Sequence, residues 1–157
     1  MRLWLCAVGR LRAGLPEQAL FDDYRSRFDR TARPLGLGPL ALREVEDRRG
    51  GGMSAEAELS TRACPEGALR VVLDERGRTL SSVELATELA RWRDDGRHDA
   101  AFLIGGADGL ASDLRAGADI ALSLGRMVWP HMLARVMLAE QLYRAATILA
   151  GLPYHRS

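Results

Sequence analysis

The sequence contains no lysine: all 22 of its basic residues are arginine. Codon bias in a GC-rich genome is the simplest explanation. The absence still constrains function, because any contact with phosphate must then use the planar guanidinium fork, which suits bidentate geometry. With a net charge of +1, the chain has no bulk attraction to nucleic acid, although balanced charge does not exclude a local basic face.

Long apolar runs are also missing. No run approaches the length that spans a membrane, and the N-terminal stretch MRLWLCAVGRL lacks the apolar centre and cleavage site of a signal peptide. We therefore expect a soluble, cytoplasmic protein that does not contact a membrane. The two cysteines, Cys6 and Cys64, predict neither a disulfide framework nor a metal site, and we expect both to be buried or incidental.

Several signatures of common enzyme classes are absent. The sequence has no Walker loop, nucleophile elbow, zinc pattern, paired carboxylates or G-x-G-x-x-G motif. The absence of a motif that cradles phosphates disfavours the common nucleotide-binding α/β enzymes. The double glycine Gly105-Gly106 indicates only that the backbone approaches something closely. Either a ligand or a neighbouring segment of the chain would satisfy it.

The 157 residues are enough for one domain with a real core, and no repeat or linker divides residues 1–157. Apolar runs alternate with helical patterns along the whole chain. This alternation predicts an α/β fold with a single doubly wound parallel sheet of about five or six strands and helices on both faces. The expected strands are 2–8, 40–45, 69–73 and 100–104, with a fifth in the C-terminal stretch; the expected helices are 16–33, 54–64, 81–96, a weaker 112–122, and 132–150.

The last helix, 132–150, organises the rest of the prediction. Pro130 suits its start, Gly151 its C-cap, and Pro153 prevents its continuation. Its apolar residues spread around most of the circumference, which indicates burial on more than one side. One side can pack on the protein's own sheet, and the other most simply packs on a second copy of the chain.

Polar residues interrupt this helix. Glu140 and Arg144 are four residues apart and can form an ion pair. Arg135 lies on a different side and has no obvious local partner. Together with the polar tail 153–156, it suggests an anion-binding rim.

The three histidines and one glycine-rich stretch remain to be interpreted. We expect His98 to be solvated and His131 to be satisfied by backbone at the start of the helix. His155 lies in a tail rich in functional side chains, although a frayed terminus is the alternative. The stretch 46–52, EDRRGGG, predicts either a mobile surface loop or an arginine-bearing loop that closes over nucleic acid.

Ligands of open α/β sheets bind outside the carboxyl ends of the strands. Three such ends carry suggestive residues: Leu73-Asp74, Gly105-Gly106 and the segment around 127–129.

Three motifs at characteristic spacing closely resemble the ribosomal RNA large subunit methyltransferase H family. They are FLIGGADGL at 102–110, LSLGRMVWPHMLARVMLAEQLYRA at 122–145 and PYHR at 153–156, and the resemblance extends over the whole chain. It implies a SPOUT-class fold with a C-terminal trefoil knot. It also implies a homodimer that uses S-adenosylmethionine to methylate N3 of a pseudouridine in 23S ribosomal RNA. The assembled ribosome is the expected substrate, although the sequence does not distinguish it from free RNA.

The resemblance also implies where the site lies, with no metal in it. The expected catalytic residues are His155 as base or proton relay, Arg135 and Arg156 holding phosphates or the uracil anion, and Tyr154 stacking on the base. We expect the tail of one chain to complete the pocket of the other. The expected cofactor-binding residues are Leu73, Gly105, Leu124, Gly125, Arg126, Met127, Val128 and Trp129.

The chain departs from the family pattern at three of these positions. Where the family often has Ser-Leu-Ser and Met-Thr, this chain has Gly125 and Val128 without hydroxyls, and Trp129 replaces a smaller residue. If backbone groups hold the cofactor, the loss is tolerated; if side-chain hydroxyls do, affinity falls. The rival interpretation is a knotted, non-catalytic RNA-binding or ribosome assembly factor that has lost cofactor binding.

Overall fold

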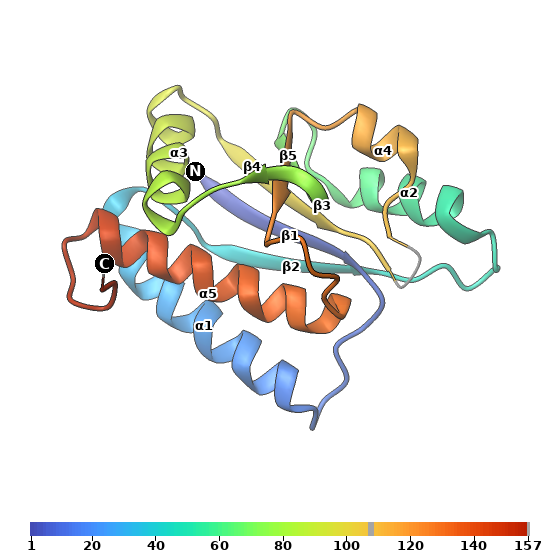
Figure 1. The fold of residues 1–157 in the computed structure, drawn as a ribbon, viewed down its shortest axis with the longest axis horizontal. Helices are drawn as coiled ribbons and strands as arrows, with labels where there is room; N and C mark the ends of the chain where they lie inside the picture. Colours follow the sequence, from blue (N-terminus) through green and yellow to red (C-terminus); the bar gives the residue numbers. More distant parts are fainter. Residues whose placement is uncertain (107–108, 157) are drawn as a thin grey trace.

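The computed structural model describes residues 1–106 and 109–156 (Figure 1). Its centre is a five-stranded parallel sheet in the order β2-β1-β4-β3-β5. The parallel sheet predicted from the sequence is therefore confirmed. The strands are β1 (Arg2–Val8), β2 (Leu40–Val45), β3 (Leu69–Thr79), β4 (Asp99–Ile104) and β5 (Ile120–Ser123).

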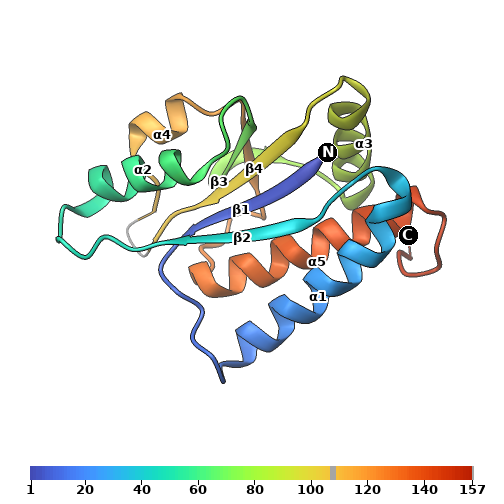
Figure 2. The same ribbon diagram turned by 180° about the vertical axis from the view of Figure 1, so that it is seen from behind.

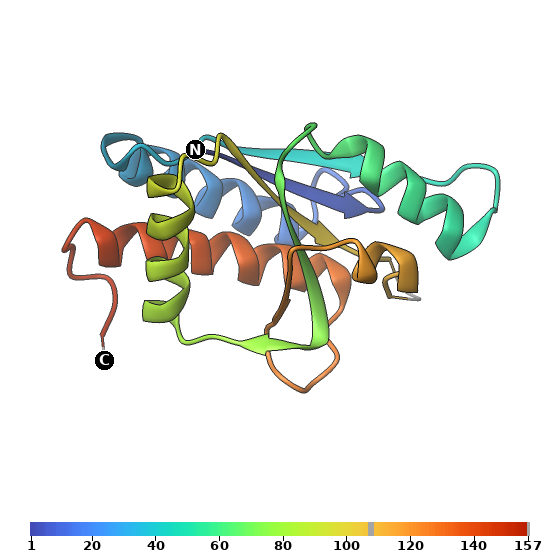
Figure 3. The same ribbon diagram turned by 90° about the horizontal axis from the view of Figure 1, so that it is seen from above.

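Helices cover both faces of the sheet, as expected. Three long helices pack on one face, and a medium and a short helix pack on the other (Figures 2 and 3). The first group is α1 (Pro16–Ala32), α3 (Ser82–Asp94) and α5 (His131–Leu149); the second is α2 (Gly52–Ala63) and α4 (Ser112–Ala116). Within the described residues, no helix combines the length and apolarity needed to cross a membrane.

Successive side chains of a strand point to opposite faces of the sheet, so each face has its own hydrophobic core. In β1, Leu3 and Leu5 face the three-helix side, where they meet Phe21 of α1 and the rest of the larger core. Cys6 faces the other side, where its Sγ lies 3.9 Å from that of Cys64 at the end of α2. Both cysteines are buried, as predicted.

Strand β3 is longer than predicted. The expected strand ended at residue 73, because polar residues follow, but pairing with β5 resumes after a bulge: Leu73 and Arg78 both align with Leu122. Gly77 makes this second approach possible, since a Cβ there would lie 2.6 Å from the Ala121 carbonyl. The close packing is a backbone contact between distant segments, which hydrophobic patterning does not reveal.

The prediction of a helix over 112–122 is correct only for its first half. Helix α4 ends at Ala116, and Ile120–Ser123 forms the edge strand β5 instead. The segment 127–129 is not a strand. Helix α4 has five residues and strand β5 has four. Both are too short for the hydrophobic periodicity of a helix or of a strand to be recognised in the sequence.

Helix α5 has nearly the predicted limits. It ends in a Schellman cap: Gly151 has φ +66°, and the amides of Gly151 and Leu152 donate to the carbonyls of Ile148 and Thr147. Its burial on several sides is confirmed, but α1 and α3 of the same chain supply much of it. Leu133, 39% exposed, is the one large apolar side chain of α5 that stays open to solvent.

Candidate functional site

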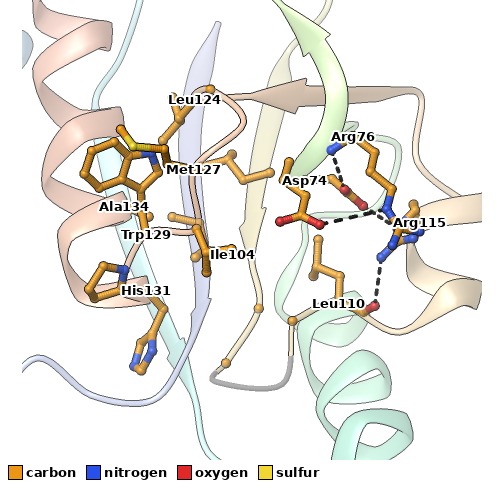
Figure 4. A pocket seen from close by; sticks show the side chains of 18 residues that line it. Asp74, Arg76, Ile104, Leu110, Arg115, Leu124, Met127, Trp129, His131 and Ala134 are labelled. Atoms are coloured by element: carbon orange, nitrogen blue, oxygen red, sulfur yellow. Dashed lines mark hydrogen bonds and ion pairs between the residues drawn. The ribbon is translucent and has the colours of Figure 1, made fainter.

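A pocket of about 740 Å³ opens at the carboxyl ends of β3 and β4, where the turn after β5 leads into α5 (Figure 4). Parallel strands direct their C-terminal loops to one edge of a sheet, which explains why segments from three parts of the chain meet here. The pocket is lined by Leu73, Asp74, Glu75, Arg76, Ile104, Gly105, Gly106, Gly109, Leu110, Arg115, Leu124, Gly125, Met127, Val128, Trp129, Pro130, His131 and Ala134.

The two sides of this pocket differ in character. Trp129, Met127 and Leu124 form an apolar wall beside α5. On the opposite side lie Asp74 and Arg115. A ligand with an apolar ring and a polar end would match this division.

The polar side is held by a nearly buried carboxylate. The Asp74 side chain is 5% exposed; its Oδ2 forms an ion pair with Arg115 Nε, and its Oδ1 accepts from the Arg76 amide at 2.9 Å. Arg115 also donates to the Leu110 carbonyl at 3.5 Å. Asp74 and Arg115 thus tie the bulged part of β3 to α4 on the polar side of the pocket.

The double glycine has a structural explanation. A Cβ on Gly105 would lie 2.3 Å from the Gly109 carbonyl oxygen, so the chain's own loop requires glycine there. The sequence left open whether a ligand or a neighbouring segment of the chain requires the close approach. The neighbouring segment at Gly109 is sufficient to explain it. Gly105 and Gly106 nevertheless line the pocket with exposed backbone.

The structure brings together seven of the eight residues predicted to bind a cofactor, leaving out only Arg126. The Arg126 side chain is exposed beyond the pocket lining. Gly125 adopts φ +115°, and its amide donates a hydrogen bond to the Ser123 hydroxyl oxygen at 3.1 Å. Glycine at 125 therefore suits this turn, because other residues rarely adopt such a positive φ.

His131, which was expected only to be satisfied by backbone at the start of the helix, lines the pocket. It is the first residue of α5, and burial followed by the nearby Arg135 guanidinium lowers its pKa. Ile104 and Arg115 were missed as well. No local signal marks Arg115, because its partner Asp74 is distant in sequence.

Arg135 has no partner on its own helix, as expected, but the inference that it is unpaired is wrong. Its side chain is completely buried: Nη1 donates to Glu44 at 2.8 Å, and Nη2 donates to the carbonyls of Val8 and Gly9 at 2.5 and 2.9 Å. Glu44 also accepts from the Leu11 amide at 2.6 Å. Burial lowers the pKa of Arg135. Its partners lie on β1 and β2, far away in sequence, so no helical spacing could reveal them.

The predicted Glu140–Arg144 ion pair is confirmed, and the tail packs on it. The Tyr154 hydroxyl donates to Glu140 Oε1 at 3.0 Å, and the Tyr154 ring lies 4.6 Å from that of Tyr143. His155 is partly buried, and its Nδ1 has no hydrogen-bond partner within residues 1–106 and 109–156.

The tail follows the C-terminal end of α5 (Figure 1), whereas His131 and Ala134 at the other end of this helix line the pocket. A helix of 19 residues is about 28 Å long at ~1.5 Å per residue. One chain therefore does not bring Tyr154, His155 and Arg156 to the predicted cofactor residues.

A second cavity of about 630 Å³ lies between α1, α3 and α5. Leu124 and Gly125 line both cavities, so the two are neighbours. Leu20, Met137 and Glu140 also face this second cavity, which extends along α5 toward the tail. Among the described residues, no group of histidine, cysteine and acidic side chains could hold a metal ion.

Comparison with known proteins identifies the class first. Residues 1–155 match the family model described as "Predicted SPOUT methyltransferase". The fold is similar to that of a probable methylase family protein from Haemophilus influenzae Rd KW20, with a TM-score of 0.52 and 15% identity, covering 99% of this chain and 70% of that one. The protein is a SPOUT methyltransferase.

Close relatives narrow the class to one family. The chain is 70% identical over 156 residues to a protein of Cereibacter sphaeroides named Ribosomal RNA large subunit methyltransferase H. It is 67% identical over 156 residues to the protein of that name from Dinoroseobacter shibae, and both alignments cover 99% of each chain. The chain therefore belongs to the ribosomal RNA large subunit methyltransferase H family, as its motifs predicted.

Proposed function

We propose that this protein transfers a methyl group from S-adenosylmethionine to N3 of a pseudouridine in 23S ribosomal RNA, with the assembled ribosome as substrate. The observation that carries the proposal is the 740 Å³ pocket, in which seven of the eight expected cofactor residues meet. The relatives' names support the same reaction class and leave no observation in favour of a non-catalytic assembly factor.

The residues of the pocket fit this cofactor. Its volume suits a ligand of that size, and Trp129, Met127 and Leu124 offer an apolar wall for the adenine. The Trp129 indole Nε1 is a buried donor without a hydrogen-bond partner in the described part of the chain, so an acceptor on the ligand would satisfy it. The backbone at Gly105 and Gly125 would hold the remaining polar groups. When bound, S-adenosylmethionine supplies a methyl group on a sulfonium, ready for in-line displacement.

The protein's own contribution is then to align the base and accept a proton. The N3–H of the base must be lost as the nitrogen attacks, and His155 is the group that we assign to this proton. Its Nδ1 is buried in the single chain and has no hydrogen-bond partner in the described residues, so a proton donor on the substrate would satisfy it. Arg156, exposed beside it, would hold RNA phosphate or the developing anion. Arg135 is not assigned such a role, because its guanidinium is completely buried.

Tyr154 was expected to stack on the base. In this structure its ring already packs against Tyr143 and lies 4.9 Å beneath the Arg144 guanidinium. We therefore assign Tyr154 to holding the tail and leave recognition of the RNA to His155 and Arg156.

A homodimer, working in the cytoplasm, would complete the site. Because pocket and tail lie at opposite ends of α5, two chains with antiparallel α5 helices would bring the tail of one to the pocket of the other. The second cavity, with Leu20 47% exposed and Val128 83% exposed nearby, offers apolar surface for such a contact. The chain path, in which β3 bulges around β5 before α5 begins, is also compatible with the trefoil knot of the class.

Transfer of a labelled methyl group to ribosomes that lack the modification tests the function directly. We expect stoichiometric label in 23S RNA, mapped to N3 of a pseudouridine, and loss of transfer in His155→Ala with cofactor binding retained. If the wild-type protein binds S-adenosylmethionine but leaves such ribosomes unlabelled, the proposal is wrong.

A further inference from the structure

The carboxylate of Glu140 is the point at which the tail is attached to α5. It collects donors from three side chains: Arg144 donates through Nη2 at 2.5 Å and Nε at 3.1 Å, Tyr154 through its hydroxyl at 3.0 Å, and Gln141 through its amide at 2.7 Å. The Gln141 carbonyl oxygen accepts in turn from Ser82 of α3 at 2.7 Å. The network therefore joins the tail, α5 and α3.

Tyr154 is held by its ring as well as by its hydroxyl. The Arg144 guanidinium lies 4.9 Å from the ring centroid on one side, and Tyr143 contacts the ring at 4.6 Å with a 54° tilt. Burial, and then the hydrogen bond to Glu140, raise the pKa of Tyr154, so the phenol stays protonated and remains a donor at neutral pH. Arg144 thus fixes both the carboxylate and the ring that bonds to it.

The backbone directs the chain back to this point. The Schellman cap at Gly151 ends α5, and the turn at Pro153 follows, with the Tyr154 amide donating to the Leu152 carbonyl at 2.9 Å. Residue 154 therefore returns to a side chain 14 positions earlier, and His155 directly follows the anchored tyrosine. The Glu140 and Arg144 side chains are only 16% and 26% exposed, so the pair is largely shielded from solvent. Three donors converge on Glu140 at this chain reversal, and together they determine where the tail lies.

We propose that Glu140 and Arg144 are positioning residues that fix Tyr154 and thereby set the location of His155 for methyl transfer. This inference rests on the proposed function and adds residues to it that touch neither the cofactor pocket nor the reacting atoms. Misplacement of a reacting group by about 1 Å can reduce a rate ~100-fold. Loss of the anchor therefore impairs transfer, while the pocket at the far end of α5 keeps its affinity for the cofactor.

Glu140→Gln tests this, because it keeps the side chain's size but removes the charge that holds Arg144. We expect the single-turnover rate of methyl transfer to fall at least ~10-fold, and hydrogen exchange at the amides of residues 154–156 to accelerate. The dissociation constant for S-adenosylmethionine, measured by calorimetry, stays within about twofold, since neither Glu140 nor its partners Arg144 and Tyr154 line the cofactor pocket. Glu88→Gln is the matched control: Glu88 is 19% exposed against 16% for Glu140, and it is paired with Arg91 on α3, away from the tail.

Tyr154→Phe is the second variant. It retains the ring contacts but loses the hydroxyl. We expect slower methyl transfer, faster hydrogen exchange in the tail and unchanged cofactor affinity, with a smaller loss of rate than in Glu140→Gln. If Glu140→Gln does not fold, this variant tests the inference. An unchanged transfer rate, unchanged tail exchange, or an equal loss in Glu88→Gln would each overturn the inference. Should the wild-type protein transfer no methyl group at all, the proposed function fails instead, and hydrogen exchange still decides whether Glu140 anchors the tail.

Discussion

At the scale of single residues, Trp129 has the most direct consequence for ligand binding. It lies in the wall of the pocket, and its indole nitrogen is buried without a hydrogen-bond partner in the described residues. An indole N–H can only donate. Trp129 is thus suited to replace a hydroxyl that Val128 does not provide.

Trp129→Phe should weaken binding of S-adenosylmethionine about tenfold, because one hydrogen bond of roughly 1–1.5 kcal/mol is lost while the ring is largely retained. Titration calorimetry measures this. Trp92→Phe is the control: Trp92 Nε1 is equally buried and unpartnered within the described residues, but it belongs to the core beneath α3. Equal affinity in the wild-type and Trp129→Phe proteins would exclude the indole as a donor to the cofactor.

At the scale of elements, the start of α5 is attached to the sheet by one buried ion pair. Arg135 joins Glu44 of β2 to the carbonyls that end β1, beneath the pocket residue His131. A buried charge that loses its partner is strongly destabilising, whereas an exposed pair contributes little. This contact therefore fixes the position of one pocket wall.

Glu44→Gln should lower the free energy of unfolding by ~2–3 kcal/mol, since the buried Arg135 charge is left uncompensated. Urea denaturation followed by circular dichroism provides the value. Glu88→Gln, which breaks an ion pair on the surface of α3, should cost only ~0–1 kcal/mol. Similar losses of unfolding free energy in the two variants would show that the buried Arg135–Glu44 pair stabilises the fold no more than a surface ion pair does.

The same elements show how far the sequence could be interpreted. Periodicity and the signals at Pro130 and Gly151 located α5 to within one residue at each end, because both are local. The partners of Arg135 and Arg115 were not predictable, since each lies on a segment distant in sequence. Short β5 and the return of β3 past its bulge were missed because backbone contact at Gly77, rather than side-chain pattern, determines them. The pocket was located through strand ends and motifs together, but the place of His131 in its lining was not, because that place depends on how α5 packs on the sheet.

At the scale of the whole molecule, the arrangement of α5 separates the two halves of the proposed site. The pocket adjoins the first turn of the helix, and the tail adjoins the last (Figure 1). Neither the sheet nor the loops described here join them within a chain. The site that we propose therefore combines two copies of the chain, and we place the contact between them at the second cavity along α5.

Mixing two defective variants tests this central claim most directly. His155→Ala removes the tail's proton acceptor, and Trp129→Ala impairs the pocket, so each homodimer should be inactive at limiting S-adenosylmethionine. After the subunits exchange in a 1:1 mixture, half of the dimers are mixed and each has one intact composite site, so about a quarter of wild-type activity should return. Activity that stays at the level of the separate variants would contradict a site built from the pocket of one chain and the tail of its partner.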